Sequence, residues 1–286
     1  MSETALAPAG TEDGVQEATS RISVPSRPRR SPRRLLSAWG LRLFPFALVV
    51  AIWALLSAAS VIDPLLVPAP WTVAEALWGG LVDGTLWLDL GVTLYRALVG
   101  LVLGGLLGLI VGVVMGETKW ITHLLEPLIS FAFPMPKLAL LPLLIVLFGI
   151  GDGSLIVMVV LGTFFPMVVN TFAGVRGVSR VLVWNAMTLG AGRLQRLRTV
   201  ALPAALPHIL SGARIAGGVA FLLVVAAEMI SANTGLGYLV IFSQRNYRPD
   251  LVIAGILLTA LLGFIIDRLI ARSSAALLRW QDTSAG

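Results

Sequence analysis

Six long apolar runs, four of them without charge and two with a single charged residue, are each about long enough to cross a membrane as a helix. A helix needs about 20 apolar residues to span the hydrocarbon layer. The runs lack the inward and outward alternation of a membrane-barrel strand, so the pattern predicts an all-α membrane protein with six transmembrane helices. The runs are Leu43–Ile62, Ala97–Gly116, Pro127–Ile150, Gly153–Val175, Ile215–Ile230 and Leu251–Ile266. The second helix is expected to begin earlier, near Gly91.

The basic residues in the connections predict how these helices are oriented. The N-terminal segment, the second and fourth connections and the C-terminal tail together hold seventeen Lys and Arg. The first, third and fifth connections together hold two, Arg245 and Arg248. Because Lys and Arg concentrate on the cytoplasmic side of membrane proteins, both termini and the fourth connection are expected in the cytoplasm of a bacterial inner membrane.

The two ends of the chain are expected to lie outside the bundle. Residues 1–20 are small and polar, which favours disorder, and Arg27–Arg34 reads RPRRSPRR. This basic run is interpreted as a topology signal, with contact to anionic lipid or nucleic acid as the alternative. Residues 1–40 are therefore predicted to be a disordered, basic cytoplasmic segment, residues 41–270 the membrane domain, and residues 271–286 a cytoplasmic tail.

Composition supports a membrane protein and excludes several other classes. Of the 286 residues, 57% are hydrophobic and 13% are charged, against about 25% charged in soluble domains. The absence of cysteine excludes disulfides and thiolate metal sites. Gly112–Lys119 departs from the phosphate-loop pattern, and His123 and His208 lack metal-ligand spacing. No catalytic residue, metal site or bound cofactor is predicted.

The fourth connection, residues 179–214, is too long for a turn and too rich in helix-forming residues for a flexible loop. A short helix is expected at Val181–Leu189, ended by Gly190-Ala191-Gly192, and a second at Leu194–Ala201. Two Leu-Pro pairs at 202–203 and 206–207 are expected to bend the chain back towards the membrane, since proline breaks helix hydrogen bonding. A short helix held at a membrane exit suits docking into a groove of a partner protein.

This connection resembles the signature of ATP-binding-cassette (ABC) importer permeases, E-A-A-x-x-x-G followed after nine residues by I-x-L-P. The chain matches the spacing with Ala186, Gly190, Val200, Leu202 and Pro203. It departs at the first two positions, where Trp184 and Asn185 replace glutamate and alanine. Blocks similar to the sulfonate, nitrate and taurine branch lie at 65–73, 133–151, 164–178 and 227–240, so the resemblance covers about residues 65–270.

The resemblance implies a six-helix permease subunit of the type I, MetI-like fold, with its core at about 85–270 and a coupling segment at 179–210. It implies a homodimer of two permease copies and two separate ATPase subunits that bind ATP and Mg²⁺. An extracytoplasmic binding protein would deliver the solute, expected to be an aliphatic sulfonate, taurine or nitrate. The seven residues implied to couple with the ATPase are Trp184, Asn185, Ala186, Gly190, Val200, Leu202 and Pro203.

Three charges lie in or beside the predicted spans, where an isolated charge is costly. Arg96, Lys137 and Glu228 are candidates for the translocation path or for buried charge pairs. Lys137 would attract an anionic solute, or it would neutralise Glu228 or extend to the membrane interface. Alternative functions are import of a vitamin precursor such as a pyrimidine or riboflavin, proton-coupled secondary transport through Glu228 and Arg96, and a membrane scaffold.

Overall fold

A computed structural model describes residues 32–59 and 63–278, with their side chains from Phe44 onward. The chain divides into two units, residues 1–52 and 53–286. Helix α2 (Pro32–Ala58) begins in the first unit and ends in the second. Residues 1–31 and 279–286, which include most of the predicted N-terminal segment and half of the predicted tail, lie outside the described residues.

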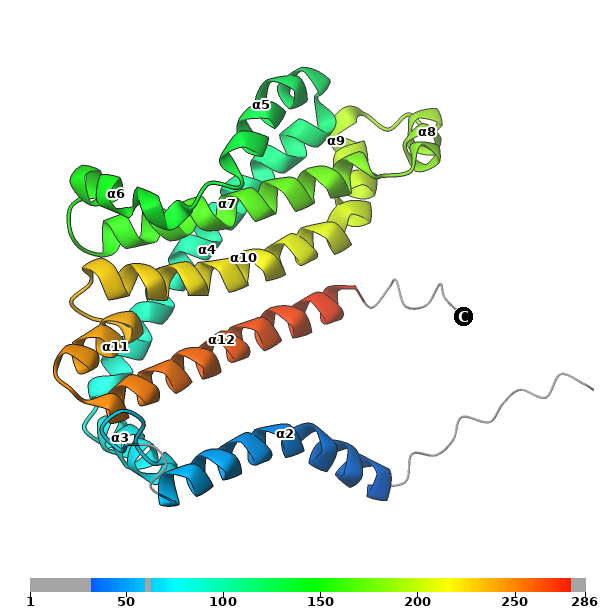
Figure 1. Ribbon diagram of the computed structural model, residues 1–286. Helices are drawn as coiled ribbons and strands as arrows, with labels where there is room; N and C mark the ends of the chain where they lie inside the picture. Colours follow the sequence, from blue (N-terminus) through cyan, green and yellow to red (C-terminus); the bar gives the residue numbers. More distant parts are fainter. Residues whose placement is uncertain (1–31, 60–62, 279–286) are drawn as a thin grey trace, which may run out of the picture. The chain divides into compact units, whose positions relative to one another are not determined.

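The described part of the second unit is helical throughout, and four long helices dominate it (Figure 1). These are α4 (Thr85–Glu117), α7 (Asp152–Arg176), α10 (Leu202–Ser231) and α12 (Pro249–Leu277). The shorter elements are α3 (Pro70–Val82), α5 (Lys119–Ala132), η1 (Lys137–Leu140), α6 (Leu141–Phe148), α8 (Arg180–Thr188), α9 (Arg193–Arg196), η2 (Leu197–Ala201) and α11 (Leu236–Arg245).

Four of the six predicted spans are confirmed as helices long and apolar enough to cross a membrane. They are α4, α7, α10 with its preceding turns, and α12. The predicted span Pro127–Ile150 is instead bent by 90° between α5 and the η1–α6 segment, where Pro134 and Pro136 interrupt the helix. The apolar part of α2 described here, Phe44–Ala58, is shorter than a full span. The count of six therefore stays a prediction.

Small residues explain why α4 and α7 make the most extensive helix contact in this unit. A glycine recurs every fourth residue of α4, at Gly100, Gly104, Gly108, Gly112 and Gly116. An added Cβ at each would collide with side chains or backbone of α7, for example with Thr163 at Gly104 and Thr171 at Gly112. Such spacing lets two helix backbones approach closely, which is how helices associate in a membrane.

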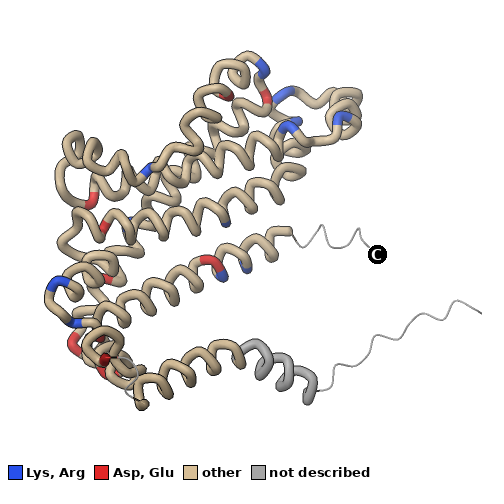
Figure 2. Tube along the Cα trace, viewed as in Figure 1, with Lys and Arg blue, Asp and Glu red and all other residues tan. Residues whose placement is uncertain are grey.

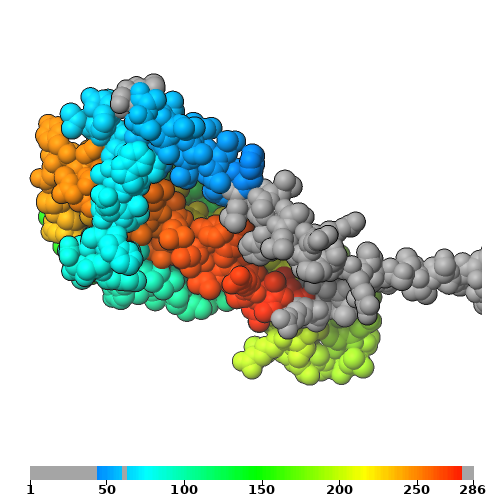
Figure 3. All heavy atoms as spheres, turned by 90° about the horizontal axis from the view of Figure 1, so that it is seen from below, coloured from blue at the N-terminus to red at the C-terminus, as the bar shows by residue number. Residues whose placement is uncertain are grey.

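Helix α10 packs on the other side of α7 and repeats this close approach (Figure 1). Cβ atoms added at Gly162 or Gly174 of α7, or at Gly212 of α10, would each meet the facing helix. Helix α12 packs on α10 and α11, and α3 lies against α12, as the cyan and orange-red surfaces show in Figure 3.

Most charged residues lie towards the two ends of the long helices, and the Arg214–Asp267 ion pair lies partway along α10 and α12 (Figure 2). One end holds α8, α9 and the first residue of α5, with several Lys and Arg. The other end holds the beginnings of α4 and α7 and the loop between α10 and α11, where acidic residues gather. We call these the α8 end and the loop end.

Candidate functional site

The coupling segment begins with helix α8, which confirms the helix predicted at Val181–Leu189 to within a residue. None of its residues is buried, and Trp184 is 59% exposed. Five large apolar side chains project from this short helix and its end: Val181, Leu182, Trp184, Met187 and Leu189. The helix therefore presents an apolar surface that the described part of the chain leaves uncovered.

Gly190 ends α8 in a Schellman motif, a helix end closed by two backbone hydrogen bonds. The amide of Ala191 donates to the carbonyl of Ala186 at 3.0 Å, and the amide of Gly190 donates to that of Met187 at 2.9 Å. Gly190 has φ of 81°, a left-handed conformation that glycine adopts without strain. The two signature positions, Ala186 and Gly190, thus belong to one capping structure. A Cβ on Gly190 would meet no atom within 4 Å.

The segment after Gly192 differs from the prediction of a second short helix followed by bends. Helix α9 continues through η2, a π-helical turn, directly into α10. Pro203 lies in the first turn of α10 and Pro207 lies inside it, so the Leu-Pro pairs do not break the chain. Pro203 has no amide hydrogen to donate to the carbonyl of Thr199, so one helix hydrogen bond is missing. The π-helical turn before it, in which amides bond to carbonyls five residues back, lets the helix continue despite this missing bond.

Contacts with the membrane bundle fix the base of the coupling segment. Arg193 donates from Nη2 to Oγ1 of Thr118 at 2.9 Å and to the carbonyl of Glu117 at 3.2 Å. Leu202 packs on a buried cluster that contains Met167 and Ala205. Val200 is partly buried, whereas Asn185 and Pro203 are exposed. Arg193 and the signature residue Leu202 therefore attach this segment to the bundle.

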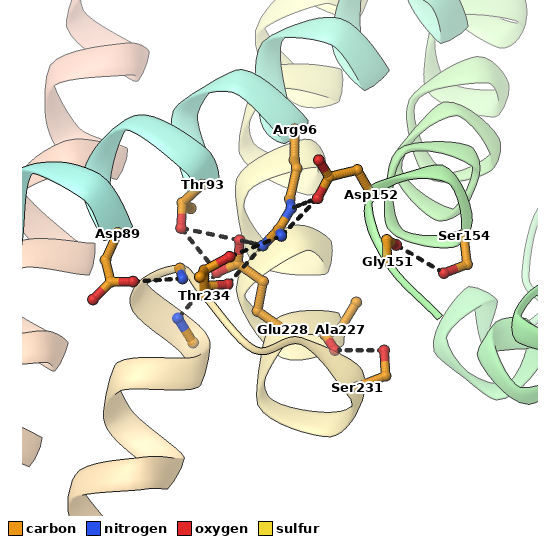
Figure 4. A network of polar contacts seen from close by, with 12 residues as sticks. Asp89, Thr93, Arg96, Gly151, Asp152, Ser154, Ala227, Glu228, Ser231 and Thr234 are labelled. Carbon is orange, nitrogen blue, oxygen red and sulfur yellow. Dashed lines mark hydrogen bonds and ion pairs between the residues drawn. The ribbon is translucent and has the colours of Figure 1, made fainter. Parts of the chain in front are cut away.

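The loop end contains a buried polar network centred on Arg96, shown in Figure 4. Arg96 is 4% exposed and Glu228 is 1% exposed. Arg96 donates from Nη1 to Oε1 of Glu228 at 2.8 Å and from Nε to Oδ1 of Asp152 at 2.8 Å. It also donates to the backbone carbonyl of Thr234 at 2.7 Å. One guanidinium therefore joins α4, α7, α10 and the loop before α11.

The second carboxylate oxygen of Glu228 completes the network. The hydroxyl of Thr93 donates to Oε2 at 2.8 Å, and the amide of Gly237 donates to it at 3.0 Å. The amide of Gly235 donates to Oδ1 of Asp89 at 2.7 Å. Gly235 has φ of 114°, and a Cβ there would overlap the Glu228 carboxylate. The loop is thus held closely against two acids.

Sequence reasoning named Arg96 and Glu228 but missed Thr93, Asp89 and Asp152. The partner of Glu228 is Arg96, and Lys137 takes no part in this network. Asp152 begins α7, where an acid also favours the positive helix N-terminus, so its position after Gly151 offered a signal. Nothing in the sequence alone places residues 93 and 228, separated by 135 positions, side by side.

Lys137 lines a separate apolar cavity of about 490 Å³ between the η1 region, α7 and α10. Its Nζ donates to the carbonyls of Ala132 and Phe133 at 2.7 and 2.5 Å and lies 4.6 Å from the centre of the Phe165 ring. A lysine has three N–H donors, so one remains. No carboxylate lines this cavity, and Lys137 forms no ion pair within the described ranges.

Comparisons with known proteins agree with this arrangement. Residues 104–279 match the model of the family described as binding-protein-dependent transport system inner membrane component. The chain is 39% identical to a putative aliphatic sulfonates transport permease protein, SsuC, of Escherichia coli K12, over 85% of this chain and 93% of that one. It is 36% identical to the taurine transport system permease protein TauC of the same organism, over 82% and 90%.

More distant similarity extends to other permeases. The riboflavin transport system permease protein RibX of Chloroflexus aurantiacus is 32% identical, over 76% of this chain and 81% of that one. Among solved structures, an inward-facing MetNI methionine ABC transporter has a chain that superposes with a TM-score of 0.59 at 20% identity. The match covers 74% of this chain and 98% of that one, which shows a shared fold.

Proposed function

Because the chain belongs to the family of binding-protein-dependent transport system inner membrane components, we propose that it carries a small organic or inorganic oxyanion into the cell, driven by a separate ATPase. The chain is a multi-pass inner-membrane permease of an ABC importer, with sulfonate and taurine permeases among its relatives. This membership sets aside the secondary transporter and the membrane scaffold. It leaves the solute and the residues that handle it to be assigned.

Helix α8 is the proposed docking element for the ATPase. Its uncovered apolar side chains, with Trp184 at the centre, suit insertion into a groove of a partner. The capping structure at Ala186 and Gly190 keeps its end rigid, and Arg193 holds its base against the end of α4. Trp184 takes the position of the family acid and acts as an apolar anchor. ATP and Mg²⁺ bind to the partner, and this chain has no enzymatic role.

The proposed assembly contains two copies of this chain, two ATPase subunits and an extracytoplasmic binding protein. In this proposal the chain has six spans, with α2 as the first and the bent α5–α6 segment as the third, so that both termini and the α8 end would face the cytoplasm. The seventeen-to-two distribution of Lys and Arg supports this orientation. The loop end, with its acidic residues, then faces outward.

The charge of the solute is proposed from the Lys137 cavity. A single cation in an apolar cavity attracts an anion, and the remaining N–H of Lys137 is available to an oxyanion oxygen. The aromatic ring of Phe165 and the apolar lining suit an aliphatic tail beside such a head group. This observation favours an aliphatic sulfonate over the zwitterion taurine, whose ammonium would need an acid. Riboflavin import stays the alternative, supported by the more distant permease RibX.

Uptake into proteoliposomes would test the proposal. The permease is reconstituted with its ATPase and binding protein, and labelled ethanesulfonate, taurine, nitrate and riboflavin are compared. We expect ATP-dependent uptake of the sulfonate that persists when the proton gradient is collapsed at constant ATP. Lys137→Met should reduce uptake at least tenfold, and Lys137→Arg should retain most of it. Uptake of riboflavin alone, or full activity of Lys137→Met, would contradict the assignment of an oxyanion.

A further inference from the structure

A basic groove of about 460 Å³ lies at the α8 end, beside α5 and apart from the Lys137 cavity. Lys119 and His123 of α5, Arg176 at the end of α7 and Arg180 at the start of α8 line it, together with Glu126. Three permanent cations thus face one carboxylate. None of the three forms an ion pair within residues 63–278. The groove therefore has an uncompensated positive charge that an anion would neutralise.

Helix α5 presents two chemically different faces, and the groove lies along one of them. Lys119, His123 and Glu126 follow each other at spacings of four and three residues, so they share a face. Trp120, Leu124 and Phe131 lie about a third of a turn further round the helix, where Trp120 is 72% exposed. A helix that is apolar on one side and basic on the other lies at the boundary between lipid tails and head groups.

The position of the groove fits this boundary. It is formed where α4 and α7, two of the apolar spanning helices, reach their last turns at Gly116 and Arg176. Basic pockets between membrane helices bind the phosphate head groups of anionic lipids. We propose that this groove binds the head group of an anionic phospholipid, with its acyl chains along the exposed apolar face of α5. The proposal requires only that the chain spans a bilayer and is independent of the transported solute.

Native mass spectrometry of the purified full-length chain can measure this binding directly. The chain in detergent is titrated with phosphatidylglycerol, cardiolipin and, as the uncharged comparison, phosphatidylcholine. We expect the first bound anionic lipid to be held at least tenfold more tightly than the first phosphatidylcholine. Equal affinity for the three lipids would overturn the proposal. So would displacement of the lipid by equimolar inorganic phosphate, because the groove would then be a site for a free anion.

Variants with opposite expected effects exclude misfolding as the explanation. Lys119→Gln combined with Arg176→Gln should lower the affinity for the first anionic lipid roughly 25-fold, because each cation near a membrane surface contributes about fivefold. Glu126→Gln removes the acid of the groove and should tighten binding several-fold. The matched control Arg268→Gln with Arg272→Gln removes two cations of α12, outside the groove, and should change little.

The same variants separate a lipid site from a protein interface. If Lys119→Gln with Arg176→Gln keeps its lipid affinity but no longer co-purifies with the ATPase, the groove binds an acidic surface of that partner, and the lipid assignment is wrong. An identical loss in the groove variant and in the α12 control would mean that only the total charge matters, which also contradicts a defined site.

Discussion

The buried pair formed by Arg96 and Glu228 allows a prediction in which one substitution repairs the damage of another. Arg96→Met removes the guanidinium that contacts Glu228, Asp152 and Thr234. The carboxyl group of Glu228, 1% exposed, would then stay buried without a cation beside it. Removing one partner of a buried ion pair typically costs about 3–5 kcal/mol, and the network gives no reason for a smaller loss.

Glu228→Gln should lower the free energy of unfolding by less than Arg96→Met does, because the remaining groups still have partners. Arg96 keeps its ion pair with Asp152 at 2.7 Å, and a glutamine oxygen can still accept from Thr93. We expect a loss of about 1–3 kcal/mol, the range for a weakened buried hydrogen bond. In the double variant no stranded carboxylate remains at position 228. Glu228→Gln introduced into Arg96→Met should therefore stabilise the protein, so the coupling energy between the two sites should exceed the loss that Glu228→Gln causes alone.

Unfolding of the purified permease in detergent, followed by circular dichroism against denaturant concentration, gives all four free energies. Arg96→Lys provides a control that retains the charge but loses the forked geometry of the guanidinium. Its free energy of unfolding should lie between those of wild type and Arg96→Met. Strictly additive losses would show that the two side chains do not interact. A greater loss for Glu228→Gln than for Arg96→Met would refute the role of Asp152 as second partner.

The other predictions concern coupling and topology. Gly190→Val places a β-branched residue at φ of 81°, which costs about 1–2 kcal/mol in backbone strain, but the added Cβ meets no neighbour. The bundle should therefore fold while ATP-driven uptake is lost. Normal uptake would show that α8 has no role in coupling. Trp184→Ala should weaken co-purification of the ATPase by about 1–3 kcal/mol, and Trp184→Glu should do the same, whereas unchanged association of both would exclude an apolar anchor. In this cysteine-free chain, an impermeant thiol reagent on intact cells should label Leu65→Cys, at a side chain 79% exposed, and spare Gln195→Cys; the reverse pattern would invert the membrane orientation.

Features encoded by neighbouring residues could be predicted from the sequence. Apolar runs gave four spanning helices because length and hydropathy suffice for a membrane helix. Helix α8 and its end at Gly190 were predicted because a helix followed by glycine is a local signal. The continuation of the helix through Pro203 was not predicted. It depends on a π-helical turn that compensates for the missing amide hydrogen, and no sequence pattern indicates such a turn.

Features that depend on pairing between distant segments could not be predicted. Arg96 and Glu228 were recognised as costly charges, but their partnership depends on how α4 and α10 pack. The 90° bend between α5 and the η1–α6 segment was missed because its apolar run continues through the break. The prolines at 134 and 136 marked the place without indicating the angle. The groove beside α5 joins residues from four helices and leaves no contiguous motif.

The glycine contacts of α7 with both α4 and α10 have a mechanical consequence for energy transfer. Glycines of α4 repeat every four residues, so sliding along α7 from one matched position to the next needs about 6 Å of travel. Smaller shifts would drive side chains into backbone, because packed interfaces have discrete arrangements. Helix α8 is joined at both ends to the layer formed by α4, α7 and α10, through α7 before it and through α9 to α10 after it. If α8 couples to the ATPase as proposed, a force on it should move α4, α7 and α10 together, and the displacement at the far end should depend on the length of these helices.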